Sequence, residues 1–261
     1  DRNPILKRRG PCMSDRPYVT LSCAMSIDGY LDTTGPERLL LSNAEDIDRV
    51  DQVRSENDAI MVGASTVRRD NPRLLIRSEE RRAARAAAGL PLSPIKVTVT
   101  SRGDLDPDAA FLTTGDAQKI VYTPLARARR LDERLRGVAT VVGLRERVTM
   151  SDLLRDLVTR RGVHRLMVEG GGTLLTQFLA EDLADELHLV IAPIFVGEAR
   201  APRVVTSGAF PWTASHRARL ASTRQIGDVV LMRYALSDRF DPYHRGELVK
   251  NIRDTAPLEA R

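Results

Sequence analysis

The chain has 261 residues, of which 42% are hydrophobic and 29% are charged, which is enough to build one sizeable core. No stretch approaches the roughly 18 apolar residues of a membrane span, and residues 1–9 are polar and basic, so we predict neither a membrane span nor a secretory signal and expect a cytoplasmic protein. The formal charge is +5, but the arginines are interleaved with acids, as in Arg49–Asp51, and only 4% of residues are aromatic. This pattern indicates a solvated arginine-rich surface and argues against nucleic-acid binding. With Cys12 and Cys23 as the two cysteines and no Cys/His cluster at zinc spacing, we expect no metal site.

The first elements in chain order are predicted from apolar runs and capping signals. Residues 1–15 lack periodicity and are expected to form a flexible lead-in, and a strand is predicted over 18–24. Ser42-Asn43-Ala44-Glu45 has the Ser-x-x-Glu pattern of a capping box, which predicts Ser42 as the cap of a helix that runs to about Arg54. A strand buried on both faces is predicted over 59–62, and residues 79–88 form either a solvated helix or a mobile insertion, since they lack an apolar stripe.

Strands then alternate with helices. Strands are predicted at 96–100, 119–122, 139–142 and 165–168, and helices at 126–135, 151–160 and 174–179. This order predicts a mostly parallel central sheet with helices on both faces. The strands expected at 186–193, 218–222 and 229–235 have no helices between them, which indicates an antiparallel C-terminal edge on the same sheet. We therefore predict a single α/β domain over about residues 16–236 and a polar tail over 237–261.

Two glycine-containing turns follow predicted strands. Gly63 is followed by the hydroxyls of Ser65 and Thr66, and Gly170–Thr173 opens a helix after the strand at 165–168. Bare backbone N–H groups at a helix N-terminus suit a phosphate, and two such turns at neighbouring strand ends would face one crevice. The alternative interpretation is two ordinary helix starts, in which the glycines serve packing. Neither turn has the Rossmann fingerprint or a Walker loop.

Four motifs together resemble a known family. They are Ala24-Met25-Ser26-Ile27-Asp28-Gly29, the stretch from Asp58 through Gly63 to Asp70-Asn71-Pro72-Arg73-Leu74, Val168-Glu169-Gly170-Gly171-Gly172-Thr173, and the segment 183–197. In order and spacing, over most of the chain, they are similar to the pyrimidine reductases of riboflavin biosynthesis.

The resemblance implies a dihydrofolate-reductase-like fold, NADPH as the hydride donor, and reduction of the ribosyl group of a 5′-phosphorylated ribosylaminopyrimidine to a ribityl group. The zinc-deaminase motifs of the bifunctional members do not occur in the chain, so it resembles the stand-alone reductases. Ser22, where many bifunctional members have Lys, favours the archaeal and fungal branch and its 2,5-diamino-6-ribosylamino-4(3H)-pyrimidinone 5′-phosphate substrate over the deaminated uracil analogue. The resemblance also implies a homodimer that pairs through sheet edges.

Site residues are carried over by position. The resemblance places the cofactor against Ala24, Thr66, Asp70, Val99, Thr100, Ser101, Arg102, Gly170, Gly171, Gly172 and Thr173. It places the substrate against Ser42, Arg54, Leu74, Arg77 and Glu169, with Arg54 and Arg77 on the ribose phosphate. Asp28 and Glu169 are the candidate catalytic residues.

Several of these roles have alternatives. Asp28 could instead be a structural turn residue, Arg102 could bind the 2′-phosphate of NADPH or be an exposed turn arginine, and Ser42 could be only a helix cap. Where the family usually has a polar loop with arginine or tryptophan, this chain has Leu39-Leu40-Leu41. The substrate could therefore be a different pterin- or pyrimidine-like compound, of the dihydrofolate type or from a specialised pathway.

Overall fold

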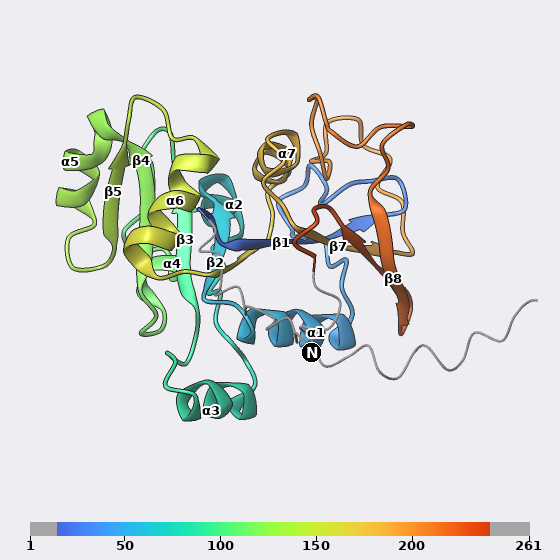
Figure 1. The fold of residues 1–261 in the computed structure, drawn as a ribbon, viewed down its shortest axis with the longest axis horizontal. Helices are drawn as coiled ribbons and strands as arrows, with labels where there is room; N and C mark the ends of the chain where they lie inside the picture. The colour runs from blue at the N-terminus through green and yellow to red at the C-terminus, as the bar shows by residue number, and fades with distance from the viewer. Residues whose placement is uncertain (1–14, 241–261) are drawn as a thin grey trace, which may run out of the picture.

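The computed structural model describes residues 15–240, which form one nine-stranded sheet with helices packed on it (Figure 1). Most of the predicted lead-in and tail lies outside these residues. The strands are β1 (Tyr18–Ser26), β2 (Ala59–Gly63), β3 (Ile95–Val99), β4 (Lys119–Pro124), β5 (Thr140–Leu144), β6 (Arg165–Val168), β7 (Glu186–Ala192), β8 (Arg219–Ile226) and β9 (Val229–Ala235). The helices are α1 (Ala44–Ser55), α2 (Ala64–Asp70), α3 (Glu79–Ala87), α4 (Ala110–Thr113), α5 (Leu125–Arg134), α6 (Met150–Arg161) and α7 (Gly172–Ala180).

The sheet order is β5-β4-β3-β2-β6-β1-β7-β9-β8, and every pair from β5 to β7 is parallel. β9 pairs antiparallel with both β7 and β8, which confirms the predicted antiparallel C-terminal edge. β7 borders both the parallel and the antiparallel part of the sheet. The crossover through α7 makes it parallel to β1, whereas its other neighbour, β9, is antiparallel to it. β2 and β6 are neighbours, so the two glycine turns that follow them lie at the same edge of the sheet.

Alternate side chains of β2 enter two different cores. Ala59 and Met61 pack with α6 and α7, whereas Ile60 and Val62 pack with α2, α4 and α5 on the opposite face. A strand covered on both faces is expected to be an unbroken apolar run, and all five residues of β2 are buried. The predicted arrangement of helices on both faces of the sheet is therefore confirmed.

Two local predictions need correction, and one short helix was not foreseen. The cap of α1 is Asn43, because its side chain accepts from Asp46 N at 2.9 Å while its amide nitrogen donates to Ile226 O at 2.7 Å; Ser42 is not the cap. The short helix α4 was not predicted, since four residues carry no period. β8 continues to Ile226, beyond the predicted end at residue 222.

Helix α3 is fastened to the domain by an arginine. Arg85 is 6% exposed and donates hydrogen bonds to the backbone oxygens of Ser55, Asn57 and Pro91. A guanidinium can satisfy several carbonyls at once, so this helix stays in place without an apolar stripe. The structure supports a docked helix and not a mobile insertion.

Lys96 on β3 is a fully buried lysine. Its Nζ donates to Phe111 O at 3.1 Å and Thr114 O at 2.7 Å, at the end of α4. Burial, with a smaller contribution from Lys119, lowers the pKa of Lys96 from 10.5 to about 8. The folded chain therefore releases this proton at a lower pH than the unfolded chain does.

Replacing Lys96 by Met should remove this pH dependence of stability. Between the folded and unfolded pKa values the unfolded state binds more protons, so stability rises with pH. The free energy of unfolding of the wild type should therefore increase relative to Lys96→Met by about 2 kcal/mol from about pH 7.5 to about pH 9.5. Urea titrations at both pH values measure this difference, and parallel curves for the two proteins would contradict it.

Candidate active site

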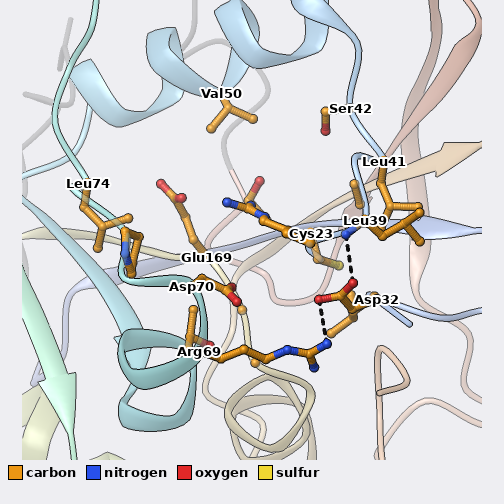
Figure 2. Close-up of a pocket in the computed structure, with 18 of the residues that line it drawn as sticks. Cys23, Asp32, Leu39, Leu41, Ser42, Val50, Arg69, Asp70, Leu74 and Glu169 are labelled. Carbon is orange, nitrogen blue, oxygen red and sulfur yellow. Dashed lines mark hydrogen bonds and ion pairs between the residues drawn. The ribbon is translucent and has the colours of Figure 1, made fainter. Parts of the chain in front are cut away.

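Two adjoining cavities form one long crevice at the carboxyl ends of the parallel strands. The larger has a volume of about 990 Å³ and the smaller about 480 Å³. Ser65, Gly171 and Thr173 line both, so the cavities meet at the two glycine turns. Figure 2 shows the larger cavity, with Leu74 and Glu169 on one side and Leu39 and Leu41 on the other.

The two glycine turns touch each other. A Cβ on Gly171 would lie 3.1 Å from Thr66 Oγ1, and Glu169 N donates to Met61 O at 2.9 Å where the turns begin. Gly170 has a φ of +108° and open space where a side chain would stand. The expectation that both turns face one crevice is confirmed, and Gly170 leaves backbone accessible to a ligand.

Gly172 has a different reason to be glycine. A Cβ there would collide with the carbonyl oxygen of Arg203, in the long loop between β7 and β8. The same loop is joined to the turn after β1 by the bridge between Tyr30 and Arg203, and Arg203 Nη2 donates to Tyr30 Oη at 2.6 Å. Although Gly172 lines the cavity, it is also the place where this loop docks against α7.

Arg54 and Glu169 form a two-pronged ion pair in the wall of the larger cavity. Arg54 Nε and Nη2 each lie 2.6 Å from a carboxylate oxygen of Glu169, and Nη1 donates to Leu75 O at 3.2 Å. Both side chains are largely buried. The family resemblance implies that Arg54 holds the ribose phosphate, but its charge is directed at Glu169, so its main effect is to orient that carboxylate.

Two other arginines remain available beside this pair. Arg73 and Arg77 line the larger cavity, are exposed, and have no ion-pair partner within residues 15–240. Asp51 holds their segment by accepting from the backbone N–H groups of Arg77 at 2.6 Å and Ser78 at 3.1 Å. Leu74, with a φ of +48° and a buried side chain, lies in the same wall of the cavity (Figure 2).

The loop before α1 forms the opposite wall. Leu39, Leu41 and Ser42 line the cavity, and Asp32 joins the loop to α2 by accepting from Leu39 N at 2.9 Å and pairing with Arg69 at 3.1 Å (Figure 2). Asp70 lines the same cavity, and its pKa is raised because the carboxylate is partly desolvated. The apolar run singled out in the sequence is therefore part of the ligand wall.

The smaller cavity lies at the end of β3. It is lined by four residues that the sequence assigned to the cofactor, Val99, Thr100, Ser101 and Arg102. Sequence reasoning missed Arg68, Asp104 and Arg147, which also line it. Arg68 pairs with Asp104 at 2.8 Å, whereas Arg102 and Arg147 have no ion-pair partner in the part of the chain that the structure describes.

Asp28 does not line either cavity. Its carboxylate accepts hydrogen bonds from Ser26 Oγ at 2.6 Å, Gly197 N at 2.8 Å and Val196 N at 3.1 Å. These bonds, that of Ser26 above all, lower the pKa of Asp28 to about 2. The carboxylate thus anchors the start of the loop after β7, and these contacts agree with the alternative interpretation of Asp28 as a structural turn residue.

Three further residues of the cavity wall were missed by the sequence analysis. Cys23 lies in the wall beside the expected Ala24, and Asp46 and Arg49 come from α1. Arg49 was interpreted as a solvated surface residue, but it is only 8% exposed. The apolar period of α1 is too weak to show which of its charges face inward.

The described part of the chain has no group of three or more metal-ligating side chains. Within the same residues, no helix combines the length and the apolar character needed to cross a membrane.

Sequence comparison gives relatives over most of the chain. The family model described as the RibD C-terminal domain matches residues 17–232. A protein of Archaeoglobus fulgidus named 2,5-diamino-6-ribosylamino-4(3H)-pyrimidinone 5′-phosphate reductase is 34% identical over 226 residues, which cover 87% of this chain and 99% of that protein. The riboflavin biosynthesis protein RibD of Bacillus amyloliquefaciens is 31% identical, and the match covers 74% of this chain and 50% of that protein.

Solved structures share the fold. RibD of Acinetobacter baumannii superposes with a TM-score of 0.69 at 23% identity, over 85% of this chain and 58% of that one. A pyrimidine reductase-like protein of Corynebacterium diphtheriae gives 0.67 at 22% identity, over 84% and 91% of the two chains. These matches confirm the predicted α/β architecture.

The contact between Gly172 and Arg203 predicts the effect of one added methyl group. Gly172→Ala should push the loop away from α7 and destabilise the fold by about 1–3 kcal/mol, because a backbone carbonyl cannot yield as a flexible side chain does. Amide exchange at Leu31 and Val204, whose N–H groups join this loop to the segment after β1, should accelerate because the displaced loop weakens these bonds. Gly208→Ala, in the same loop, is the control, since its backbone has no positive φ and a Cβ there would meet only side-chain atoms at 3.4 Å or more. Equal exchange in both variants would contradict the docking role.

Proposed function

The chain belongs to the RibD C-terminal domain family, and from this membership we propose that it reduces the ribosyl group of a 5′-phosphorylated ribosylaminopyrimidine to the ribityl form in riboflavin biosynthesis. The observation that carries this proposal is the crevice itself. Glycine backbone and a helix N-terminus lie where its two cavities meet, and the larger cavity offers a fixed carboxylate beside arginines that have no ion-pair partner in the described residues. A dinucleotide and a phosphorylated heterocycle together require these features.

The proposed cofactor is NADPH, a member of the nicotinamide class that such a reductase uses. Gly170–Thr173 and the start of α7 would hold its pyrophosphate, because Gly170 leaves the backbone uncovered. Arg102 and Arg147 line the smaller cavity without a carboxylate partner in the described residues, which suits the 2′-phosphate that distinguishes NADPH from NADH. Ala24, Thr66 and Asp70 are proposed to line the nicotinamide side.

The proposed substrate is the 2,5-diamino pyrimidinone. Glu169 would accept hydrogen bonds from N–H groups of its ring, and Arg54 keeps this carboxylate in place. Arg77, joined by Arg73, would hold the phosphate, because these two cations have no internal partner in the described chain. The relatives from Archaeoglobus fulgidus, Methanothermobacter thermautotrophicus and Aquifex aeolicus carry this substrate in their names.

Catalysis would depend chiefly on positioning. Gly170–Thr173 would hold the cofactor, which when bound would supply the hydride for C1′ of the opened ribosyl group. Glu169 orients the heterocycle, Ser42 and Leu74 border its site, and the apolar side chains of Leu39 and Leu41 exclude water from it. Asp28 acts as a positioning residue for the loop that docks on Gly172, since its carboxylate is occupied outside the crevice.

The apolar wall favours one alternative substrate class. Leu39, Leu40 and Leu41 would also suit a flatter, less polar heterocycle of the pterin type, with the same NADPH site.

The exposed edge strand β8 is available for the homodimer that the family resemblance implies.

Turnover separates these substrates. We expect the protein to oxidise NADPH, followed at its absorbance band, when the diamino ribosylaminopyrimidine phosphate is added, and to be far less active with NADH. Dihydrofolate should give no turnover. Turnover of dihydrofolate alone would favour the pterin alternative, and no turnover of either compound would contradict the proposal.

Substitution of Glu169 should affect the substrate more than the cofactor. Glu169→Gln keeps the shape of the side chain but removes the charge that pairs with Arg54, so KM for the pyrimidine should rise about 10- to 100-fold. The Kd for NADPH should change by less than about 2-fold, because the glycine backbone is retained. Glu133→Gln, on the exposed face of α5, is the control. A loss of NADPH affinity equal to the rise in KM would place Glu169 on the cofactor instead.

A further inference from the structure

Arg49 is a buried cation in the wall of the crevice. It lies on α1, lines the larger cavity together with Cys23 of β1, and its side chain is 7% exposed. No role in ligand binding follows from the motifs of the sequence. A guanidinium in such a position needs most of its hydrogen bonds satisfied.

A network of buried groups fixes the orientation of this guanidinium. Its Nε donates to Asp46 Oδ1 at 2.7 Å, and its Nη1 lies 3.3 Å from His188 Nδ1. Because Arg49 can only donate, His188 Nδ1 accepts and His188 Nε2 donates to Glu186 Oε1 at 2.7 Å. Glu186 is held in turn by Arg233 at 2.6 Å. These contacts keep Arg49 in one orientation before any ligand arrives.

The Nη2 group is the part of Arg49 that this network leaves unused. Among residues 15–240, nothing accepts a hydrogen bond from Nη2, while Nε and Nη1 are both engaged. An arginine that lines a cavity, is more than nine-tenths buried and keeps both N–H groups of Nη2 free is arranged to donate to a ligand.

The local charge indicates which kind of acceptor fits. Asp46 already balances the charge of Arg49, whereas Arg73 and Arg77 have no carboxylate partner within the described chain and are better suited to a phosphate dianion. A donor-only group excludes an amino group as its partner. A neutral acceptor, such as the ring carbonyl oxygen of a pyrimidinone, fits this donor.

We propose that Arg49 is a specificity-determining residue, whose Nη2 donates to the ring carbonyl oxygen of the pyrimidinone. This inference rests on the proposed function and adds a recognised atom to it. It predicts that the protein distinguishes a pyrimidinone from the same compound with hydrogen in place of the carbonyl oxygen.

The test compares the two compounds in two proteins. The wild type should show a KM about 10- to 100-fold lower for the pyrimidinone than for the deoxo analogue, as for one hydrogen bond from a charged donor. Arg49→Met alone would leave Asp46 buried without its cation, so the variant is Arg49→Met/Asp46→Leu, which removes the pair together. This variant should lose the discrimination while keeping its Kd for NADPH. Arg129→Met, at a side chain that is 93% exposed, is the matched control.

Each outcome decides a different point. Wild-type discrimination in the double variant would overturn the role of Arg49 and leave the proposed function standing. If the wild type turns over neither compound, the proposed function falls, and the inference falls with it. If the double variant does not fold, Arg49→Lys retains the charge but loses the planar fork, and it should also discriminate less; wild-type discrimination there would overturn the inference.

Discussion

The parallel pairing of β2 with β6 is the constraint on which the crevice depends. Parallel neighbours end at the same edge of a sheet, so their following turns must meet there. Here they meet so closely that a Cβ on Gly171 would come within 3.1 Å of Thr66 Oγ1. A larger residue at Gly171 would press on the Thr66 side chain and strain a backbone with a φ of +81°, at the point where the two cavities join.

The remaining walls are brought to this junction by segments distant in sequence. The loop after β7 is held at one end by Asp28 and reaches Gly172 through Arg203, while the loop before α1 is held to α2 by Asp32 and Arg69. Each of these contacts is made by one or two polar side chains, in contrast to the extended apolar cores on the two faces of the sheet. Rigid strands thus fix the position of the turns, and individual side chains fix the loops that complete the site.

This division explains what the sequence could predict. The strands, most helices and the two glycine turns follow from short-range periods and from glycine spacing, which the chain carries locally. The capping box pointed to Ser42 as the cap of α1, but the cap is Asn43. Its side chain is held in place by a bond to Ile226 O, which lies far along the chain and could not be foreseen from the local sequence. Likewise, nothing near Arg54 indicates that its partner is Glu169, and nothing near Arg49 indicates that it is buried. Ion pairs between distant elements are properties of the fold and not of a window of sequence.

Some arginines of the crevice pair with a carboxylate and others do not, and this difference affects what each can bind. Arg49, Arg54 and Arg69 each face a carboxylate, so their charge is balanced and their remaining N–H groups can orient neutral polar atoms. Arg73 and Arg77 are exposed cations without such a partner in the described residues, as are Arg102 and Arg147 at the other end. Two ligands bound end to end, with their phosphates at the two ends of the crevice and their neutral rings facing each other between them, would match this order. If the same net charge were spread evenly along the crevice, it would attract anions but would not fix the position of a hydride donor relative to its acceptor.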